Sequence, residues 1–166
     1  MNIHLQAPPW LPPAVWVYLL SLLPSVEARY ALPVGVSLGV PPAEAALAAG
    51  LGVATLSLAL PPALAWAHGL AERLASRPRG ALARLAGLYL RYARRARERA
   101  GPAAERWGLL GVVAFVAAPL PGTGVWTGAL AAHLLGIPRR RAAAALLAGG
   151  LLSEALTGLP TLALGS

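Results

Sequence analysis

The sequence contains no cysteine, no lysine and no aspartate. Without cysteine there is no disulfide, iron–sulfur cluster or thiol nucleophile. Without lysine there is no Schiff-base chemistry and no phosphate-binding P-loop, so Gly122-Thr123-Gly124 is not a Walker motif. The three histidines, His4, His68 and His133, have no partner at metal-ligand spacing. No Ser-His-Asp set, paired-carboxylate hydrolytic site or dinucleotide fingerprint is present, so we expect no enzymatic activity, no cofactor and no metal.

Charged residues are scarce too: 12% of the 166 residues are charged, 57% are hydrophobic, and the mean hydropathy is +0.62. This composition is typical of membrane proteins. The net charge of +8 comes from arginines that border apolar segments instead of alternating with aromatic residues, which argues against nucleic-acid binding. We therefore predict an all-α integral membrane protein, with residues 1–166 forming a single membrane domain.

A pattern of prolines and glycines occurs twice. Each copy reads Leu-Pro, fourteen further residues, then Gly-x-Pro, and the offset of 97 residues also superposes Gly52 on Gly149. The copies are Leu23-Pro24 with Gly39-Val40-Pro41, and Leu120-Pro121 with Gly136-Ile137-Pro138. Apolar segments interrupted by Pro and Gly in corresponding halves point to the binding site of transporters built from inverted repeats. We predict that the chain is a duplicated half.

Segment lengths indicate what each half contains. Residues 14–40 form two short apolar arms around a polar centre, whereas about 20 residues are needed to cross a bilayer. Two half-length arms predict a re-entrant hairpin, which is allowed at membrane depth where its tip is packed in protein or faces water. Residues 45–67 are long enough for a full span, which we expect Pro61-Pro62 to kink or to end early. The first repeat is therefore residues 14–68.

The second half has the same organisation. Residues 107–138 are predicted to form a second re-entrant hairpin, and residues 142–164 a second full span, within a repeat of residues 107–166. Residues 69–106 form a linker that holds ten of the fourteen arginines, and three more are Arg139, Arg140 and Arg141. Both groups fall on one side of the membrane, which the positive-inside rule makes cytoplasmic. Both termini then lie outside, and the two repeats are inverted in the inner (plasma) membrane.

The linker also shows helical periodicity. Between residues 79 and 100 one stripe carries apolar and aromatic residues, and most arginines lie elsewhere. The stripe consists of Leu82, Leu85, Tyr89, Tyr92 and Ala96. One interpretation is an amphipathic helix on anionic headgroups. The other is a basic linker that only fixes topology.

Two charged residues, Glu27 and Arg29, lie at predicted membrane depth. A charge there costs at least about 2.5 to 3.5 kcal/mol and is a functional candidate by default. A spacing of two residues does not place them face to face on a helix, so each needs a partner elsewhere. Arg29 offers a planar fork of donors for a phosphate or carboxylate, and Glu27 is a candidate for proton coupling. The alternative is a buried ion pair that locks the two hairpins together.

The second hairpin tip supplies neutral candidates for substrate binding. Its glycines allow successive backbone amides to point into one concavity, which is a typical anion site. The candidates are Pro121, Gly122, Thr123, Gly124, Trp126 and Thr127. Hydroxyls and small residues are also enriched where membrane helices simply touch. Glu154 lies near the middle of the second span and is a second candidate proton-coupling group, although the repeat aligns it with Ser57.

Two stretches resemble a known family. Residues 27–33 resemble its E-x-R-x-A-x-P motif, and residues 119–128, PLPGTGVWTG, resemble its PLPGTGAWTG motif, with Val125 in place of alanine. This is the bacterial and archaeal small multidrug export protein family, and the resemblance covers about residues 20–155. The family is similar to the DedA/VTT superfamily, which has paired re-entrant hairpins and includes carriers that flip undecaprenyl phosphate and other lipids. The resemblance implies a DedA-like fold, with Glu27 and Arg29 as the family's acid and base.

These observations lead to one main hypothesis. The chain is expected to be a transporter that moves an anionic amphipathic substrate, for example a lipid phosphate, between the hairpin tips with proton or sodium coupling. Arg29 and the tip amides would hold the anionic head while the tail stays among membrane lipids. The alternatives are a small-molecule or drug exporter and a non-transporting structural membrane protein. A homodimer is also expected, since two spans and two hairpins bury little on their own.

Overall fold

The computed structural model describes residues 8, 10–24, 26–76, 80–120 and 123–164. Every regular element among these residues is a helix, which confirms the predicted all-α class. In chain order the helices are α1 (Pro13–Ser21), α2 (Glu27–Ser37), α3 (Pro42–Ala75), α4 (Ala81–Ala117), α5 (Val125–Leu134) and α6 (Arg139–Leu164).

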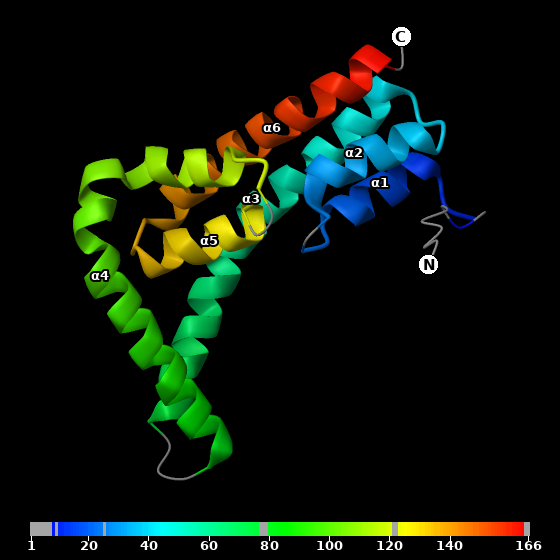
Figure 1. Cartoon of the computed structure of the whole chain (residues 1–166). Helices are drawn as coiled ribbons and strands as arrows, with labels where there is room; N and C mark the ends of the chain where they lie inside the picture. Colours follow the sequence, from blue (N-terminus) through cyan, green and yellow to red (C-terminus); the bar gives the residue numbers. More distant parts are fainter. Residues whose placement is uncertain (1–7, 9, 25, 77–79, 121–122, 165–166) are drawn as a thin grey trace.

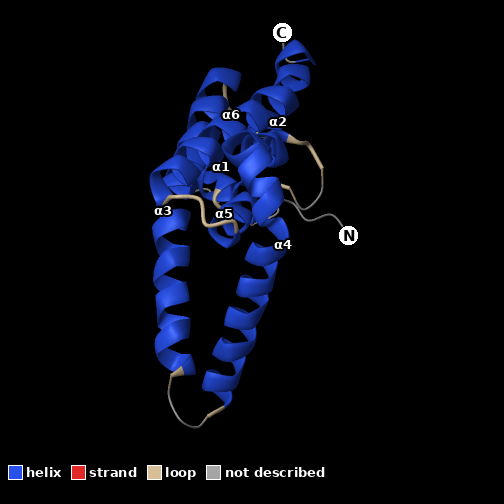
Figure 2. Cartoon of the chain, turned by 90° about the vertical axis from the view of Figure 1, so that its left-hand side faces the viewer, coloured by secondary structure: helices blue, strands red, loops and turns tan. Residues whose placement is uncertain are grey.

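The packing of the helices follows the sequence repeat. The long helices α3 and α6 pack against each other, the α1–α2 pair packs on α3, and the α4–α5 pair packs on α6. The second helix of each pair also reaches the other half, since α2 packs on α6 and α5 on α3. Figure 1 shows α1 and the end of α6 at the same end of the molecule. Figure 2 shows the lower parts of α3 and α4 leaving the body together as an antiparallel pair.

The repeated Gly-x-Pro pattern has the same local structure in both copies. Gly39 (φ 84°) and Gly136 (φ 73°) adopt a left-handed conformation that glycine takes without steric cost, and each ends the second helix of its pair. The amide of the following residue donates to the carbonyl five residues back, from Val40 to Gly35 at 3.1 Å and from Ile137 to Ala132 at 3.0 Å. The repeat therefore encodes the same helix C-terminus in both copies, with this hydrogen bond at equivalent positions.

Helix α3 runs further than the sequence predicts. It continues through Pro61 and Pro62 to Ala75, so of the two effects expected of the prolines, a kink or an early end, the early end was wrong. Each proline removes one amide donor from the helix, but Leu60 and Pro61 are buried and their packing holds the chain in helical form. At about 1.5 Å per residue its 34 residues span about 51 Å, more than the roughly 30 Å of a bilayer core.

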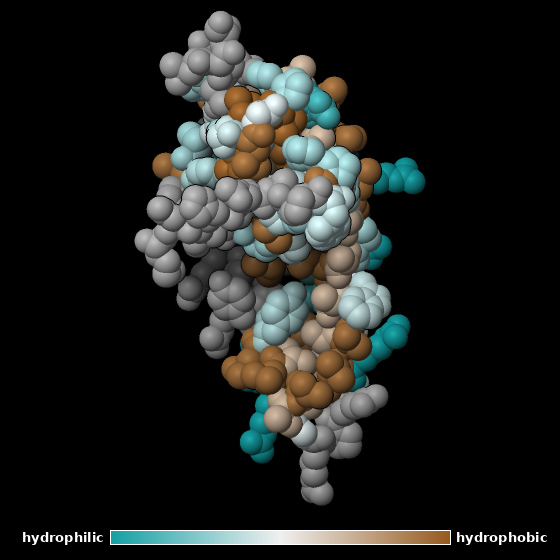
Figure 3. Space-filling model, turned by 90° about the vertical axis from the view of Figure 1, so that its right-hand side faces the viewer, coloured by the Kyte–Doolittle hydropathy of each residue, from teal (hydrophilic) through white to brown (hydrophobic). Residues whose placement is uncertain are grey.

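Among the described residues, α3 is the one helix that is both long and apolar enough to cross a membrane. Two shorter apolar helical stretches, Trp107–Ala117 and Val125–Leu134, belong to the second predicted hairpin. The outer face of α3 exposes Leu47, Leu51 and Leu58 while its inner face is packed with small residues. Figure 3 shows patches of apolar side chains on one side of the molecule, between residues of intermediate hydropathy, with the most hydrophilic ones near its edges. Such a surface fits a location in a membrane.

Helix α4 joins the basic linker to the second apolar arm. Its backbone is broken at Gly108 (φ 40°, ψ −123°), so the stretch before this glycine and the stretch after it point in different directions. In the predicted linker stripe, Leu82 and Leu85 are exposed, and Ala86 instead is buried. The side chains of Tyr92 and Ala96 lie outside the described part of the chain.

Candidate functional site

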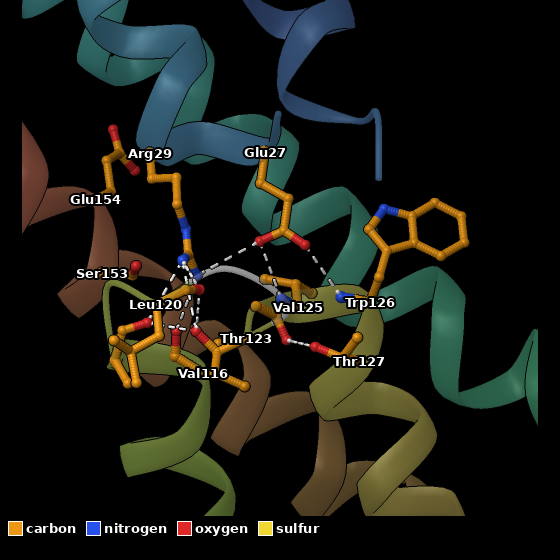
Figure 4. Close-up of polar contacts among 12 residues, drawn as sticks. Glu27, Arg29, Val116, Leu120, Thr123, Val125, Trp126, Thr127, Ser153 and Glu154 are labelled. Atoms are coloured by element: carbon orange, nitrogen blue, oxygen red, sulfur yellow. Dashed lines mark hydrogen bonds and ion pairs between the residues drawn. The ribbon is translucent and has the colours of Figure 1, made fainter. Parts of the chain in front are cut away.

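The N-termini of α2 and α5 face each other, and the Glu27 carboxylate lies between them. Glu27 is the first residue of α2. Its Oε2 accepts a hydrogen bond from the Val125 amide (3.1 Å), and its Oε1 accepts one from the Trp126 amide (3.4 Å), as Figure 4 shows. Each helix N-terminus carries roughly half a positive charge. One carboxylate therefore stabilises two helix ends that would otherwise repel each other.

The backbone on both sides of this contact is unusual. Glu27 has φ 46°, a left-handed conformation that is uncommon outside glycine. Its counterpart in the repeat, Gly124 (φ 153°), caps α5, and a Cβ atom at that position would overlap the Glu27 carboxyl group. Strained residues persist where the surroundings over-determine them, and they cluster at functional sites.

Arg29 completes the site from the other side. Its guanidinium donates to the carbonyl oxygens of Val116 (3.4 Å), Ala118 (3.4 Å) and Leu120 (3.1 Å), and to the hydroxyl of Thr123 (3.5 Å). These acceptors lie at the C-terminal end of α4 and just beyond it, where helix carbonyls lack partners within the helix. A positive charge is favourable there because the C-terminus of a helix carries partial negative charge.

The two halves hold each other reciprocally. The 97-residue offset pairs Arg29 with Trp126, and the indole Nε1 of Trp126 donates to the carbonyl of Leu22, just after α1, at 3.2 Å. Arg29 and Trp126 thus each donate to the backbone where the opposite hairpin turns, and their neighbours Glu27 and Gly124 touch between them. The candidate site lies where each repeat meets its counterpart.

The site is buried and its charges nearly cancel. Glu27 and Arg29 are 8% and 7% exposed, and Arg29 Nη2 lies 3.9 Å from Glu27 Oε2. A buried ion pair is stabilised only when further hydrogen bonds satisfy both partners, as the tip amides and carbonyls do here. Removal of either charge would leave the other uncompensated.

The other candidates of the second tip lie around this contact. The hydroxyl of Thr123 is bonded to the carbonyls of Ala118 (2.5 Å) and Leu120 (2.8 Å), and that of Thr127 donates to the Gly124 carbonyl at 3.3 Å. These bonds hold the turn and the first turn of α5. Pro121 and Gly122 lie outside the described residues.

Glu154 is buried but belongs to a different surface. It lies on α6 and lines a groove between α3 and α6, and it forms no ion pair with Arg29. Its neighbour Ser153 is also buried, and so is Ser57, the position aligned with Glu154 in the repeat. Neither serine hydroxyl has a hydrogen-bond partner among the described residues.

Sequence patterns missed two sets of contacts, one in the site and one at the other end of α5. The carbonyl acceptors of Arg29 carry no side-chain signature, because any residue offers a carbonyl. The contact between His68 of α3 and His133 of α5, with ring centroids 5.1 Å apart, joins residues that look isolated along the chain. No group of three or more potential metal ligands occurs in the described part of the chain.

Comparison with models of known protein families gave a match. The model of a family described as "Putative small multi-drug export protein" matches residues 27–156, about three quarters of the chain. The matched region begins at Glu27 and includes the second tip and Glu154. Neither the curated proteins nor the solved structures gave a match.

Proposed function

This chain belongs to the small multi-drug export protein family, and we propose that it exports small amphipathic molecules across the plasma membrane with proton coupling at Glu27. The observation that carries the proposal is the tip contact, in which one carboxylate lies between two helix N-termini from opposite repeats. The family name supports an exporter, and the apolar helix α3 supports a membrane location.

In the proposed mechanism Glu27 is a latch between the two halves. While ionised, its carboxylate accepts hydrogen bonds from the amides of Val125 and Trp126 and lies beside Arg29. A proton on the carboxyl group would remove the negative charge that both helix ends and Arg29 need. The tips would then repel each other, and α2 could separate from α5. Alternate protonation of Glu27 would thereby couple a proton gradient to motion of one repeat against the other.

Topology is part of the same proposal. The α1–α2 pair and the apolar end of α4 with α5 would be re-entrant hairpins, as in the DedA/VTT superfamily. Helices of 9 to 11 residues reach only about 14 to 17 Å, which supports hairpins that stop near mid-bilayer. The basic linker would be cytoplasmic and both termini outside, since arginines are enriched on the cytoplasmic side.

The latch can be tested in proteoliposomes that carry an imposed pH gradient, with ethidium as the transported probe. We expect Glu27→Gln to reduce gradient-driven flux at least about tenfold, because the amide can no longer alternate between charge states. Glu44→Gln is the matched control, since Glu44 is an exposed carboxyl in the first turn of α3. Wild-type flux in Glu27→Gln would refute the latch. Absence of flux in the unmodified protein for every probe would favour the structural alternative.

A second candidate function is the transport of a lipid phosphate, for example one like undecaprenyl phosphate. It is favoured by a specific observation: the first amides of α5 already hold an anion, the Glu27 carboxylate, with the guanidinium of Arg29 beside it. A phosphate could take that place when Glu27 is protonated. Flipping of a fluorescent polyprenyl phosphate, lost in Arg29→Ala and Glu27→Gln, would support this candidate. Unchanged flipping in both variants would exclude it.

A further inference from the structure

An apolar groove lies between α3 and α6. Its volume is about 760 Å³, within the range of roughly 300 to 1,000 Å³ typical of sites for small molecules. Most of its walls are small or aliphatic side chains, including Ala46, Gly50, Ala54, Leu147 and Leu151. Among the lining residues that the structure describes, Glu154 is the one that is charged. We call this feature the α3–α6 groove.

The Glu154 carboxyl group lies inside the groove. The residue is 6% exposed. Its Oε2 would lie 3.4 Å from a Cβ atom at Gly50, so the side chain reaches across from α6 to the opposite wall on α3. Glycine at this position leaves room beside the carboxyl group.

The charge of Glu154 has no partner in the described part of the chain. No hydrogen bond or ion pair there reaches its carboxyl oxygens, whereas Arg29, the cation of the tip contact, is engaged by Glu27 and by backbone carbonyls. The charges of Glu27 and Arg29 offset each other, and that of Glu154 remains. A buried carboxylate without a partner is unfavourable, so a cation that enters the groove would be strongly stabilised.

We propose that the α3–α6 groove binds amphipathic monocations, such as lipophilic ammonium or phosphonium compounds, with Glu154 as the charge partner. This inference rests on the proposed function and names the substrate class of the exporter. The apolar walls suit the hydrocarbon body of such a compound, and the single carboxylate suits one positive charge. A lipid acyl chain or a helix of a second copy would fill the same space but would leave Glu154 unpaired.

The test compares two probes of nearly equal shape and opposite charge. Tetraphenylphosphonium and tetraphenylborate are titrated calorimetrically into the full chain in detergent. We expect the cation to bind and the anion to bind at least about tenfold more weakly. Glu154→Gln should weaken binding of the cation at least about tenfold and remove the discrimination between the probes. Glu44→Gln, at an exposed carboxyl on α3 outside the groove lining, should change neither affinity.

A second variant addresses the space instead of the charge. Ala54→Phe should fill part of the groove and weaken the binding of the cation, while Glu154 itself is unchanged. Equal binding of the two probes, or wild-type affinity in both Glu154→Gln and Ala54→Phe, would overturn the proposal. A change in bound lipid or in oligomeric state without a change in affinity for the cation would do the same. Binding is measured here without transport, so the two proposals can fail separately. Cation binding without any transport would refute only the proposed export function. Transport without cation binding in the groove would refute only the proposed binding site.

Discussion

Gly124 shows how a single residue can set the distance between the two halves. Its φ of 153° and the overlap that a Cβ atom would make with the Glu27 carboxyl group both argue against any side chain. We expect Gly124→Ala to lower the free energy of unfolding by about 2 kcal/mol, as is usual for overpacking at a buried site. Thermal unfolding in detergent measures this.

Gly87 provides the matched control. It lies within α4, and a Cβ atom there would meet no other atom within 4 Å. Gly87→Ala should therefore be neutral or stabilise the protein by up to about 1 kcal/mol, because alanine is the better helix former. Equal losses in the two variants would mean that the tip contact is no tighter than an ordinary helix surface.

The residues of the tip contact were predictable from sequence because their chemistry is rare there. Charges at membrane depth are unusual, so Glu27 and Arg29 stand out, and the PLPGTGVWTG stretch stands out by its family motif. The sequence alone did not show which groups Glu27 and Arg29 contact. In the structure the Glu27 carboxylate accepts from the Val125 amide, just after the tip glycines whose amides were expected to bind an anion, and Gly124 allows that approach. Glu154 was expected as a coupling group, but its groove depends on the packing of α3 on α6, which no local pattern encodes.

At the scale of helices, two glycines at equivalent positions of the repeat each allow two helices to pack closely. A Cβ atom at Gly52 on α3 would overlap Ser21 of α1, and one at Gly149 on α6 would lie 2.8 Å from the Val113 carbonyl oxygen of α4. Each glycine therefore lets a long helix approach the first arm of its own hairpin, as small residues do where membrane helices pack.

This equivalence predicts that alanine destabilises the protein at both positions. Gly149→Ala should cost about 1 to 3 kcal/mol of unfolding free energy, because a backbone carbonyl cannot turn away. Gly52→Ala should cost a similar amount, since the Ser21 Cβ atom would lie 2.8 Å away and does not move when the side chain rotates. Gly69→Ala, at an open position of α3, is the control and should cost nothing. Thermal unfolding of the three variants measures these costs, and an effect at Gly69 equal to that at Gly149 would contradict the prediction.

The helices were predictable where the positions of proline and glycine and the length of the apolar segment indicate the same boundaries. The turns at Gly39 and Gly136 follow the repeat, since only a few residue types end a helix in this way. The continuation of α3 past Pro61 and Pro62 was not predictable, because it depends on burial of that segment in the assembled fold. The break at Gly108 was missed too, since an isolated glycine in a helical pattern has no fixed meaning.

The whole molecule has an inner layer of small residues and an outer layer of leucines. Alanines and glycines bring α3 and α6 together, while Leu47, Leu51 and Leu58 point outward. In a soluble protein the polar side chains would take the outer position. The exposed leucines also offer surface for a second copy, so the homodimer expected from the small buried volume stays a prediction.

The orientation of the chain in the membrane can be tested with single introduced cysteines, because the chain has no cysteine of its own. Ser37, at the end of α2, and Ser76, just after α3, are both exposed. If α3 spans the membrane and the basic linker is cytoplasmic, Ser37→Cys should react with an impermeant maleimide added to intact cells. Ser76→Cys should react only after the cells are opened. The unmodified chain has no thiol and is the blank. Labelling of both cysteines from the same side would contradict a span between them, and with it the inverted arrangement of the repeats that the proposed latch requires.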